Sequence, residues 1–332
     1  MVDMSEALPV RQLAFGFVLP RCLHVIAQLG VADLLGDEPQ TPEDLARATG
    51  TDPESLRRVM RTLASAAVFE DLGDRFGHSP ASRFLRSDHP QSMLGLVRFA
   101  GADYQWATWG ALEHSVRTGR PGFDHIYGCN SFAYFKANPE AGRVFDQAMT
   151  GVSIADIDAA VRLYDFSRFA TVADIGGGAA HFLRAVLEAA PGASGVLLDL
   201  PEVAESSAAE PHPRIAFRGG DFFQDALPRC DVYLLMKILH DWDDTACVAL
   251  LRNIRRAAGP DSRVIVVEQF LPDTPGPGAG KIVDIEMLVL TGGRERTTPQ
   301  YRALLAAGGF ELLDVTLLPT GMALTEAGPI AS

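Results

Sequence analysis

The sequence is poor in cysteine and contains no long apolar run. Four cysteines occur among 332 residues, and they form no C-x-x-C motif, which argues against a disulfide framework or a zinc site. They are Cys22, Cys129, Cys230 and Cys247. No stretch of eighteen apolar residues exists, so we expect no membrane-spanning helix. The first six residues, MVDMSE, lack the basic and then apolar order of a signal peptide. These absences predict a cytoplasmic protein with reduced cysteines.

Basic residues are too few to balance the acidic ones. The chain has 29 lysines and arginines against 42 aspartates and glutamates, which gives a net charge of −13. Phosphate backbones repel such a surface unless a local basic patch overrides the net charge. The length predicts about two domains, and the composition favours an enzyme that acts on a small molecule rather than on nucleic acid.

The first half of the chain shows helical periodicity. Apolar residues between 19 and 34 recur at near-helical spacing. A Thr-Pro pair begins a helix over 41–50 that a glycine ends, and an Asp-Pro pair at 52–53 begins another. Alternation around LGDRFG predicts a hairpin over 68–78. Helix, turn, helix and hairpin is the order of a winged helix.

The pattern of predicted secondary structure changes near residue 165. Residues 101–165 are predicted to be helical and are rich in aromatics, whereas strands alternate with helices from 166 to 332. The predicted strands are 171–175, 195–200, 215–218, 232–236 and 264–268, followed by a hairpin of 312–318 and 322–326. Such alternation predicts an α/β fold with a doubly wound parallel sheet and an antiparallel strand at its end. We therefore expect domains at 1–100 and 166–332, with a helical linker between them.

A glycine-rich loop follows the first predicted strand, in DIGGGAAH at 174–181. Ligands of doubly wound sheets sit beyond the carboxyl ends of the strands, where Gly176 and Gly178 let the backbone approach closely. The dinucleotide motif G-x-G-x-x-G/A needs a small residue at its sixth position, and His181 stands there, which disfavours NAD. On this loop alone, a tight turn without a ligand is equally consistent.

Acidic residues end the next two strands and favour a ligand. Asp199, 21 residues after Gly178, can accept hydrogen bonds from ribose hydroxyls. Asp221 can accept from an exocyclic amine, and Phe222 can pack on a flat base. Each aspartate alone is typical of a helix cap. Together they suit S-adenosylmethionine, which has a ribose and a base but no phosphate.

A histidine follows the fourth strand, in LLMKILHDWDD. At this edge His240 can take a proton at neutral pH, so it is a candidate general base for methylation of a phenolic hydroxyl without a metal. Either Glu268, at the end of the fifth strand, or Glu295, in GGRERT, can bond the imidazole and hold its tautomer. An ion pair between Glu295 and neighbouring arginines is an equal alternative.

These motifs together resemble one known family. The chain resembles class I S-adenosylmethionine-dependent O-methyltransferases of the caffeate, hydroxyindole and bacterial polyketide-tailoring type, through DIGGG, LLDLPEV, GGDFF, LHDWDD, VVEQFLP and GGRERT. The resemblance implies a Rossmann-like catalytic domain, an N-terminal winged-helix dimerisation domain and a swapped homodimer. It implies His240 as base, flanked by Glu268 and Glu295, and Asp241 and Met149 as lining residues. Around the cofactor it implies Asp174, Gly176, Gly178, Asp199, Asp221 and Phe222.

Two positions depart from the family pattern. The last glycine of D-x-G-G-G-x-G is Ala180, and we expect its methyl group to tighten packing while cofactor binding survives. Many relatives carry Lys or Ser four residues before the histidine, where this chain has Met236. Strand alternation turns Lys237 to the other face, so it is not assigned to the adenine pocket.

Three alternative functions remain. Arg57, Arg58 and Arg61 on the second winged-helix helix would suit a DNA-binding regulator, which the net charge disfavours. The methyltransferase fold can also host hydroxylation or decarboxylation, and an NAD-dependent oxidoreductase ranks last. The acceptor is expected to be phenolic, a polyketide or an indole. Aromatics of the helical segment are candidate pocket walls, although most such residues are simply core: Trp106, Trp109, Phe132, Phe135 and Met149.

Overall fold

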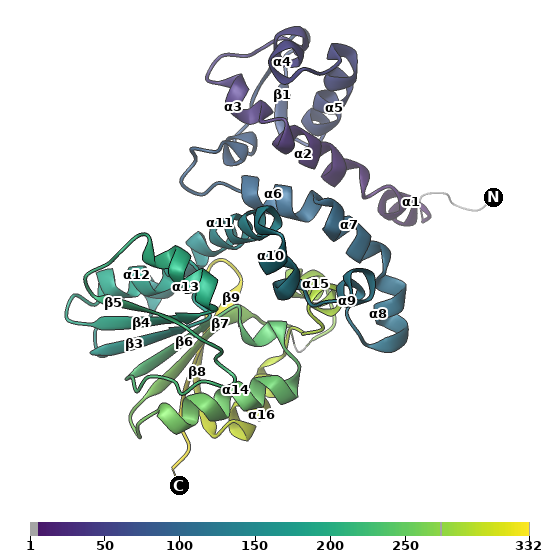
Figure 1. The fold of residues 1–332 in the computed structure, drawn as a ribbon. Helices are drawn as coiled ribbons and strands as arrows, with labels where there is room; N and C mark the ends of the chain where they lie inside the picture. Colours follow the sequence, from purple (N-terminus) through teal and green to yellow (C-terminus); the bar gives the residue numbers. More distant parts are fainter. Residues whose placement is uncertain (1–5, 273, 332) are drawn as a thin grey trace. The chain divides into compact units, whose positions relative to one another are not determined.

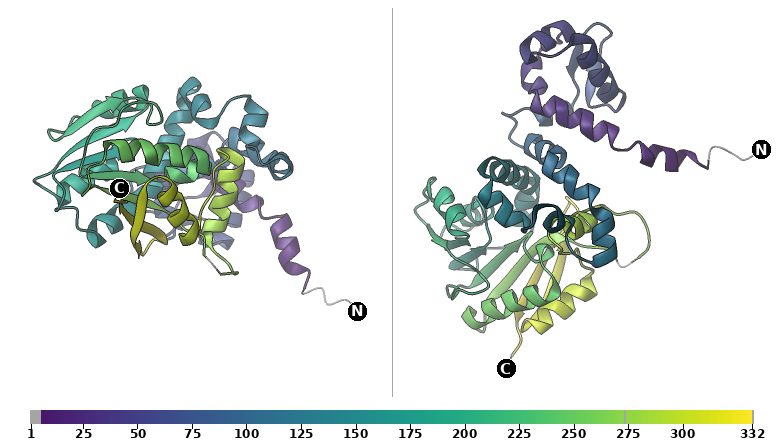
Figure 2. Two further views of the ribbon diagram at one scale, coloured as in Figure 1. Left: turned by 90° about the horizontal axis from the view of Figure 1, so that it is seen from below. Right: turned by 45° about the vertical axis from the view of Figure 1, so that its right-hand side comes forward.

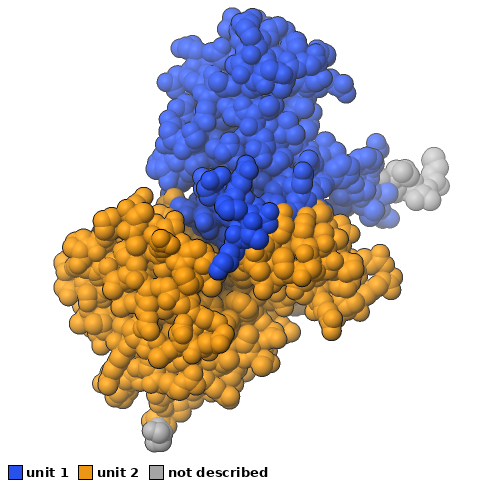
Figure 3. Space-filling model, viewed as in Figure 1, with its two compact units in different colours: residues 1–106, 135–152 blue, residues 107–134, 153–332 orange. Residues whose placement is uncertain are grey.

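The computed structural model describes residues 6–272 and 274–331, shown from three sides in Figures 1 and 2. Contacts divide the chain into two compact units (Figure 3). Unit 1 is Met1–Trp106 with Phe135–Val152, and unit 2 is Ala107–Tyr134 with Ser153–Ser332. The aromatic-rich segment 101–165 is thus shared by both units, and the domain boundaries at 100 and 165 stay predictions.

Unit 1 has the predicted order of helix, helix and hairpin. The Thr41 side chain accepts the Asp44 N–H and caps α4 (Pro42–Thr49), and the Asp52 side chain accepts the Ser55 N–H and caps α5 (Pro53–Ser65). Its opening elements are α1 (Leu8–Ala14), α2 (Val18–Gln28), α3 (Val31–Leu35), α4 (Pro42–Thr49), α5 (Pro53–Ser65), β1 (Phe69–Asp71) and β2 (Phe76–His78). Later elements are η1 (Ser82–Leu85), α6 (Leu94–Gly101), α7 (Asp103–Gly110), α10 (Ser131–Ala137) and α11 (Pro139–Leu163), the last three of which extend into unit 2.

The first apolar periodicity does not form one helix. Gly30 adopts a φ of +66°, a left-handed conformation that ends α2 and starts α3. Ile26 is fully buried in the core of unit 1, whereas Leu19 and Leu34 are each 42% exposed. The spacing therefore identified helical residues correctly but missed the break that glycine introduces.

The N-terminal helices expose much apolar surface. Leu13 is 82% exposed and Val10 is 71% exposed. Among the described residues, Leu8–Gln28 is the one stretch long and apolar enough to cross a membrane, judged by length and composition alone. A single stretch of this kind is weak support for a span, because core helices and signal sequences pass the same test. The absence of a membrane helix stays a prediction.

Unit 2 is built on a seven-stranded sheet in the order β5-β4-β3-β6-β7-β9-β8 (Figure 1). The first five strands in that order are parallel, and β9 runs antiparallel to both β7 and β8. The strands are β3 (Thr171–Ile175), β4 (Ser194–Asp199), β5 (Ile215–Gly219), β6 (Val232–Met236), β7 (Arg263–Gln269), β8 (Phe310–Leu317) and β9 (Met322–Pro329). The predicted α/β class is confirmed. The antiparallel strand is inserted beside β7, and β8 forms the edge.

Helices cover both faces of this sheet, with α12 (His181–Ala189) and α14 (Asp244–Ala257) on opposite sides (Figures 1 and 2). Successive strand residues point to opposite faces, so Leu234 packs in the core beside α12, whereas Tyr233 and Leu235 pack in the core beside α14. The helices of unit 2 are α8 (Leu112–Thr118), α9 (Gly122–Tyr127), α12 (His181–Ala189), α13 (Pro201–Ala208), η2 (Leu239–Asp241), α14 (Asp244–Ala257), α15 (Ala279–Leu290) and α16 (Thr298–Ala307). Because the parallel strands share one direction, their carboxyl ends bring the predicted site residues of unit 2 to one edge.

Candidate active site

The glycine loop, residues 176–180, turns sharply between β3 and α12. Gly176 and Gly178 have φ values of +71° and +54°. A Cβ atom on Gly176 would lie 2.6 Å from Ile238 Cδ1, and one on Gly177 would lie 2.3 Å from Asp174 Oδ2. The loop therefore needs glycine for both conformation and space.

Asp174 lies beneath this loop. Its side chain is 1% exposed, and its Oδ2 makes no hydrogen bond within the described part of the chain. Burial, together with the nearby Asp199 carboxylate, raises the pKa of Asp174 to about 7. Asp174 is thus a buried carboxyl with one unused oxygen, and ligand binding by this loop stays a prediction.

Asp199, at the end of β4, is bonded to the glycine loop. Its Oδ2 accepts the Gly178 N–H at 2.8 Å, and its Oδ1 accepts the Leu200 N–H at 2.7 Å. Burial raises the pKa of the Asp199 carboxyl, which these two amide hydrogen bonds partly offset. Each oxygen keeps a lone pair for a further donor, so the carboxylate is fixed by the loop and able to accept from a ribose.

Asp221 and Phe222 occupy the turn after β5. The Asp221 carboxylate accepts the Phe223 N–H at 2.8 Å and the Gln224 side-chain amide at 2.6 Å, so it caps this turn. The Phe222 ring lies 3.6 Å from the position of a Cβ on Gly176 and packs edge-on against Trp242. Phe222 is thus beside the glycine loop, and acceptance of an amine by Asp221 stays a prediction.

His240 lies in a short turn directly after β6, with only 9% of its surface exposed. Its Nδ1 is 2.8 Å from Glu295 Oε1, and its Nε2 is 3.9 Å from Asp241 Oδ1. A carboxylate can only accept, so Nδ1 carries the proton and Nε2 of the neutral ring is an acceptor. Burial lowers the pKa of His240, but the carboxylates of Asp241, Glu295 and Glu268 outweigh it and raise the pKa to about 9.

The two glutamates divide their tasks. Glu295 contacts the imidazole, and its neighbour Arg296 binds Asp244 instead, so the alternative of an ion pair between Glu295 and this arginine is wrong. Glu268 Oε1 accepts three main-chain N–H groups, from Ile238, Leu239 and His240, at 2.9, 2.6 and 3.3 Å. Its other oxygen accepts the Tyr301 hydroxyl. The expectation that Glu268 orients the ring needs correction: Glu268 holds the main chain on which the ring stands.

Buried residues that sequence reasoning missed surround this turn. Arg296 is 1% exposed and donates to the Leu239 carbonyl in this turn. Tyr301 is fully buried and donates its hydroxyl to Glu268, which binds the main chain of the turn. In an extended segment, adjacent side chains point to opposite sides, which is the signal in GGRERT that would have placed Arg296 behind Glu295. Lys237 follows the last residue of β6 with a φ of +56°, so strand alternation does not set its direction. Its Nζ donates to Ser153 Oγ and Asp156 Oδ2 at 3.0 Å each, and its exclusion from an adenine pocket stays a prediction.

The predicted pocket walls fall in different units. Phe132 stacks on Trp242 at 5.9 Å between ring centroids, next to Asp241 in sequence. Trp109, also in unit 2, is 36% exposed. The other three candidates, Trp106, Phe135 and Met149, belong to unit 1. Their contribution to a substrate pocket stays a prediction.

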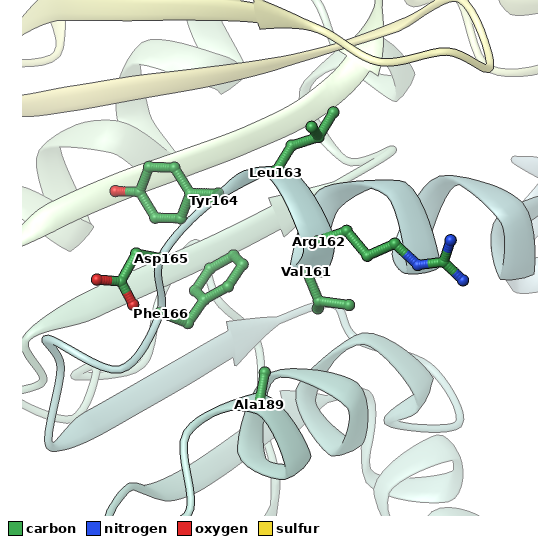
Figure 4. Close-up of a pocket in the computed structure, with 7 residues that line it drawn as sticks. All are labelled: Val161, Arg162, Leu163, Tyr164, Asp165, Phe166 and Ala189. Atoms are coloured by element: carbon green, nitrogen blue, oxygen red, sulfur yellow. The ribbon is translucent and has the colours of Figure 1, made fainter.

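A surface hollow of about 340 Å³ lies elsewhere in unit 2 (Figure 4). It is lined by Val161–Phe166 and by Ala189 at the end of α12. These residues precede β3 or end α12, so they lie at the amino ends of the strands, opposite His240 and the glycine loop. The hollow is therefore separate from the candidate site.

Comparison with known proteins identifies the class that this geometry defines. An O-methyltransferase domain model matches residues 109–311, and an O-methyltransferase dimerisation domain model matches residues 11–88. The chain therefore belongs to the O-methyltransferase family and is an S-adenosylmethionine-dependent O-methyltransferase, as the resemblance predicted.

Relatives cover nearly the whole chain. Phenazine O-methyltransferase PhzM of Lysobacter antibioticus is 40% identical over 325 residues, which are 96% of this chain and 95% of that protein. An 8-amino-8-demethylriboflavin N,N-dimethyltransferase of Streptomyces davaonensis is 40% identical over 304 residues, 88% of this chain and 87% of that protein. Human N-acetylserotonin methyltransferase, solved in complex with S-adenosylmethionine, has a TM-score of 0.91 at 27% identity and covers 99% of both chains.

Proposed function

We propose that this protein transfers the methyl group of S-adenosylmethionine to a hydroxyl of a small aromatic acceptor, with His240 as the general base. The observation that carries the proposal is the buried hydrogen bond between His240 Nδ1 and Glu295 Oε1 at 2.8 Å. It leaves Nε2 as the one ring nitrogen able to accept a proton.

The residues at the strand ends fit the cofactor. The space beside Gly178 is open, and Gly176 allows the tight turn against Ile238. Asp199 keeps lone pairs for a ribose, and Phe222 offers a ring face or edge for a base. When bound, S-adenosylmethionine supplies a methyl group on a cationic sulfonium, which is already an electrophile. We propose Asp174, Gly176, Gly178, Asp199, Asp221 and Phe222 as the residues that hold it.

His240 is suited to remove a phenolic proton. Nε2 accepts the hydroxyl proton, and the carboxylates of Glu295 and Asp241 stabilise the imidazolium that results. A phenol has a pKa of about 10, close to the value of about 9 for His240. Such matching makes the proton transfer nearly balanced in free energy. An amine acceptor already has a nucleophilic lone pair, so dependence on His240 separates O-methylation from N-methylation.

The acceptor is proposed to be a flat aromatic molecule. The named relatives act on a phenazine and on a riboflavin derivative. Phe132 is stacked on Trp242, which follows His240 by two residues in sequence, and we propose that this pair forms one wall of the acceptor pocket. A phenolic polyketide or an indole fits this wall.

We further propose a homodimer formed through the N-terminal domain. The matched dimerisation domain begins at residue 11, where Leu13 and Phe15 are 82% and 63% exposed. Association would cover this surface, and light scattering of the full chain at twice the monomer mass is the expected result. A cytoplasmic location also stays a proposal.

Two of the alternatives are not favoured. Arg57 pairs with Glu43 at 3.2 Å and Arg61 pairs with Asp71 at 3.9 Å, so two of the arginines suited to DNA are matched by carboxylates. The family match does not favour hydroxylation or decarboxylation either.

Metal independence is proposed because the sulfonium is itself cationic, and a chelator should leave the rate unchanged.

The test is a screen of phenolic acceptors with methyl-labelled S-adenosylmethionine. We expect a labelled product heavier by one methyl group on oxygen. The His240→Ala variant should lose about 10²–10⁴ in rate while it binds the cofactor with wild-type affinity in calorimetry. No labelled product from any acceptor, or undiminished turnover in His240→Ala, would overturn the proposal.

A further inference from the structure

We propose that Arg296 is a positioning residue for His240, because its guanidinium fixes the carbonyl groups of the turn that carries the imidazole. This proposal rests on the proposed function, in which His240 is the general base. We call residues 238–244 the His240 loop. It includes the short η2 turn and ends at the first residue of α14.

The guanidinium of Arg296 spans the His240 loop. Nη1 donates to Leu239 O at 2.9 Å and Nη2 donates to Trp242 O at 2.8 Å. These carbonyls stand immediately before His240 and immediately after Asp241. Nε and Nη2 also donate to Asp244 Oδ1, at 2.9 and 2.8 Å. One planar side chain thus binds the beginning, middle and end of the loop.

The N–H groups of the same loop bind a carboxylate rather than a guanidinium. Glu268 accepts the N–H groups of Ile238, Leu239 and His240. A turn of three residues is too short to satisfy these buried groups within itself, and a buried main-chain group left unpaired is costly. Two buried charged side chains therefore bind the loop: Glu268 accepts from its N–H groups, and Arg296 donates to its carbonyl groups, so both restrain its main chain.

Arg296 also connects the loop to the residue that orients the ring. The segment around Arg296 is extended, since its carbonyl accepts the Leu271 N–H at 3.0 Å. Adjacent side chains there point to opposite sides, so Glu295 contacts the imidazole while Arg296 contacts the main chain. The Arg294 N–H donates to His240 O at 2.8 Å. Loss of Arg296 should therefore change the position of the ring relative to Glu295.

Arg214 provides a matched control within the chain. Its guanidinium donates to Leu187 O, Ala190 O and Ala193 O, at 2.7, 3.1 and 2.9 Å, at the end of α12. This arginine makes the same kind of hydrogen bond at the amino end of the sheet, away from the His240 loop. Lysine retains the charge but not the rigid fork of five donors, so Arg→Lys at both positions removes the same geometry.

The experiment compares Arg296→Lys with Arg214→Lys in the full chain. We expect kcat to fall about 10²-fold in Arg296→Lys, because a displaced base loses its alignment. The KM for S-adenosylmethionine should change by less than about threefold, because the proposed cofactor residues are untouched. Arg214→Lys should keep kcat within about threefold of wild type. Equal losses of kcat in both variants would overturn the proposal.

A second measurement needs no acceptor. The imidazole of His240 is titrated by NMR in protein with labelled histidine, assigned with His240→Ala among the eight histidines. In wild type the carboxylates of Asp241, Glu268 and Glu295 hold the pKa near 9. In Arg296→Lys we expect it to fall toward 6.5 as the ring leaves these carboxylates, although a cation is retained. An unchanged titration refutes the positioning role. If wild type methylates no acceptor, the proposed function fails while this titration still decides the role of Arg296.

A milder variant covers the case in which Arg296→Lys does not fold. Asp244 pairs with Arg296, and the Asp244 side chain is 61% exposed. Asp244→Asn therefore weakens the ion pair that fixes Arg296 on the loop, with little cost to the core. We expect a severalfold lower kcat and a lowered pKa of His240. Wild-type values for both would contradict the proposal.

Discussion

Two loops at the same edge of the sheet are built in different ways. The glycine loop takes its shape from its own residues, with left-handed backbone at Gly176, Gly178 and Ala180, and from Asp199 at the end of the neighbouring strand. The His240 loop takes its shape from buried charges far away in sequence. Its hydrogen bonds join residues separated by 28 positions, for Glu268, to 57 positions, for Arg296. The first loop is a local structure, whereas the second depends on the completed fold.

Truncating the two glutamates should give the largest effects and separate their roles. Glu268→Ala leaves three buried N–H groups and the Tyr301 hydroxyl without an acceptor, so the free energy of unfolding should fall by about 3–5 kcal/mol. Glu295→Ala removes one side-chain hydrogen bond and should cost about 1–2 kcal/mol. Both should lower kcat by at least about 10²-fold. Chemical denaturation and steady-state rates measure this, and equal stability losses would contradict the division of tasks.

A pair of glycine substitutions should affect the two loops independently. A Cβ on Gly177 would lie 2.3 Å from Asp174 Oδ2, and a Cβ on Gly293 would lie 1.9 Å from His240 O. Gly177→Ala should weaken cofactor binding by more than about tenfold, whereas Gly293→Ala should lower kcat by about 10²-fold with cofactor affinity retained. Calorimetry with S-adenosylhomocysteine and turnover assays distinguish the two, and an exchange of these phenotypes would refute the comparison.

Activity and stability should respond to pH in opposite directions. The pKa of His240 is raised to about 9 by the carboxylates around it, although burial acts in the opposite direction. The neutral base is therefore scarce at pH 7, and kcat should rise about tenfold per pH unit toward a plateau above about 9. Protonated His240 stabilises the folded state through these carboxylates. Because an unperturbed histidine has a pKa of about 6.5, this stabilisation is complete below about pH 6.5 and is lost as the pH rises through about 9. A rate that is flat between pH 7 and 9 would contradict this assignment.

Sequence patterns predicted the local features and missed the long-range ones. The strands at 171–175 and 232–236 were placed correctly because buried parallel strands are short apolar runs ended by polar residues. The choice between Glu268 and Glu295 could not be made, because it depends on which carboxylate the fold turns toward the ring. Arg296 was missed for the same reason. Gly30 was missed because helical spacing on both sides concealed a left-handed break.

Ala180 is the position where the glycine loop departs from the family pattern, and its replacement should have the smallest effect. Its φ of +62° costs an L-residue about 1–2 kcal/mol, which Ala180→Gly would relieve. Loss of a buried methyl and the greater entropy of unfolded glycine cost about as much. We expect stability within about 1 kcal/mol and cofactor affinity within about threefold of wild type. A tenfold gain in affinity would show that Ala180 restrains cofactor binding.

Removal of the acceptor hydroxyl proton by His240 can be tested by varying the acidity of that hydroxyl. Wild type and His240→Ala are compared on two acceptors of the same skeleton, one with a phenol pKa near 10 and one made acidic enough to be ionised at the assay pH. We expect the rate of His240→Ala to be about 10²–10⁴ below that of wild type for the first acceptor and about tenfold or less below it for the second, which has no proton to lose. An equal deficit for both acceptors would contradict the role of His240 as general base.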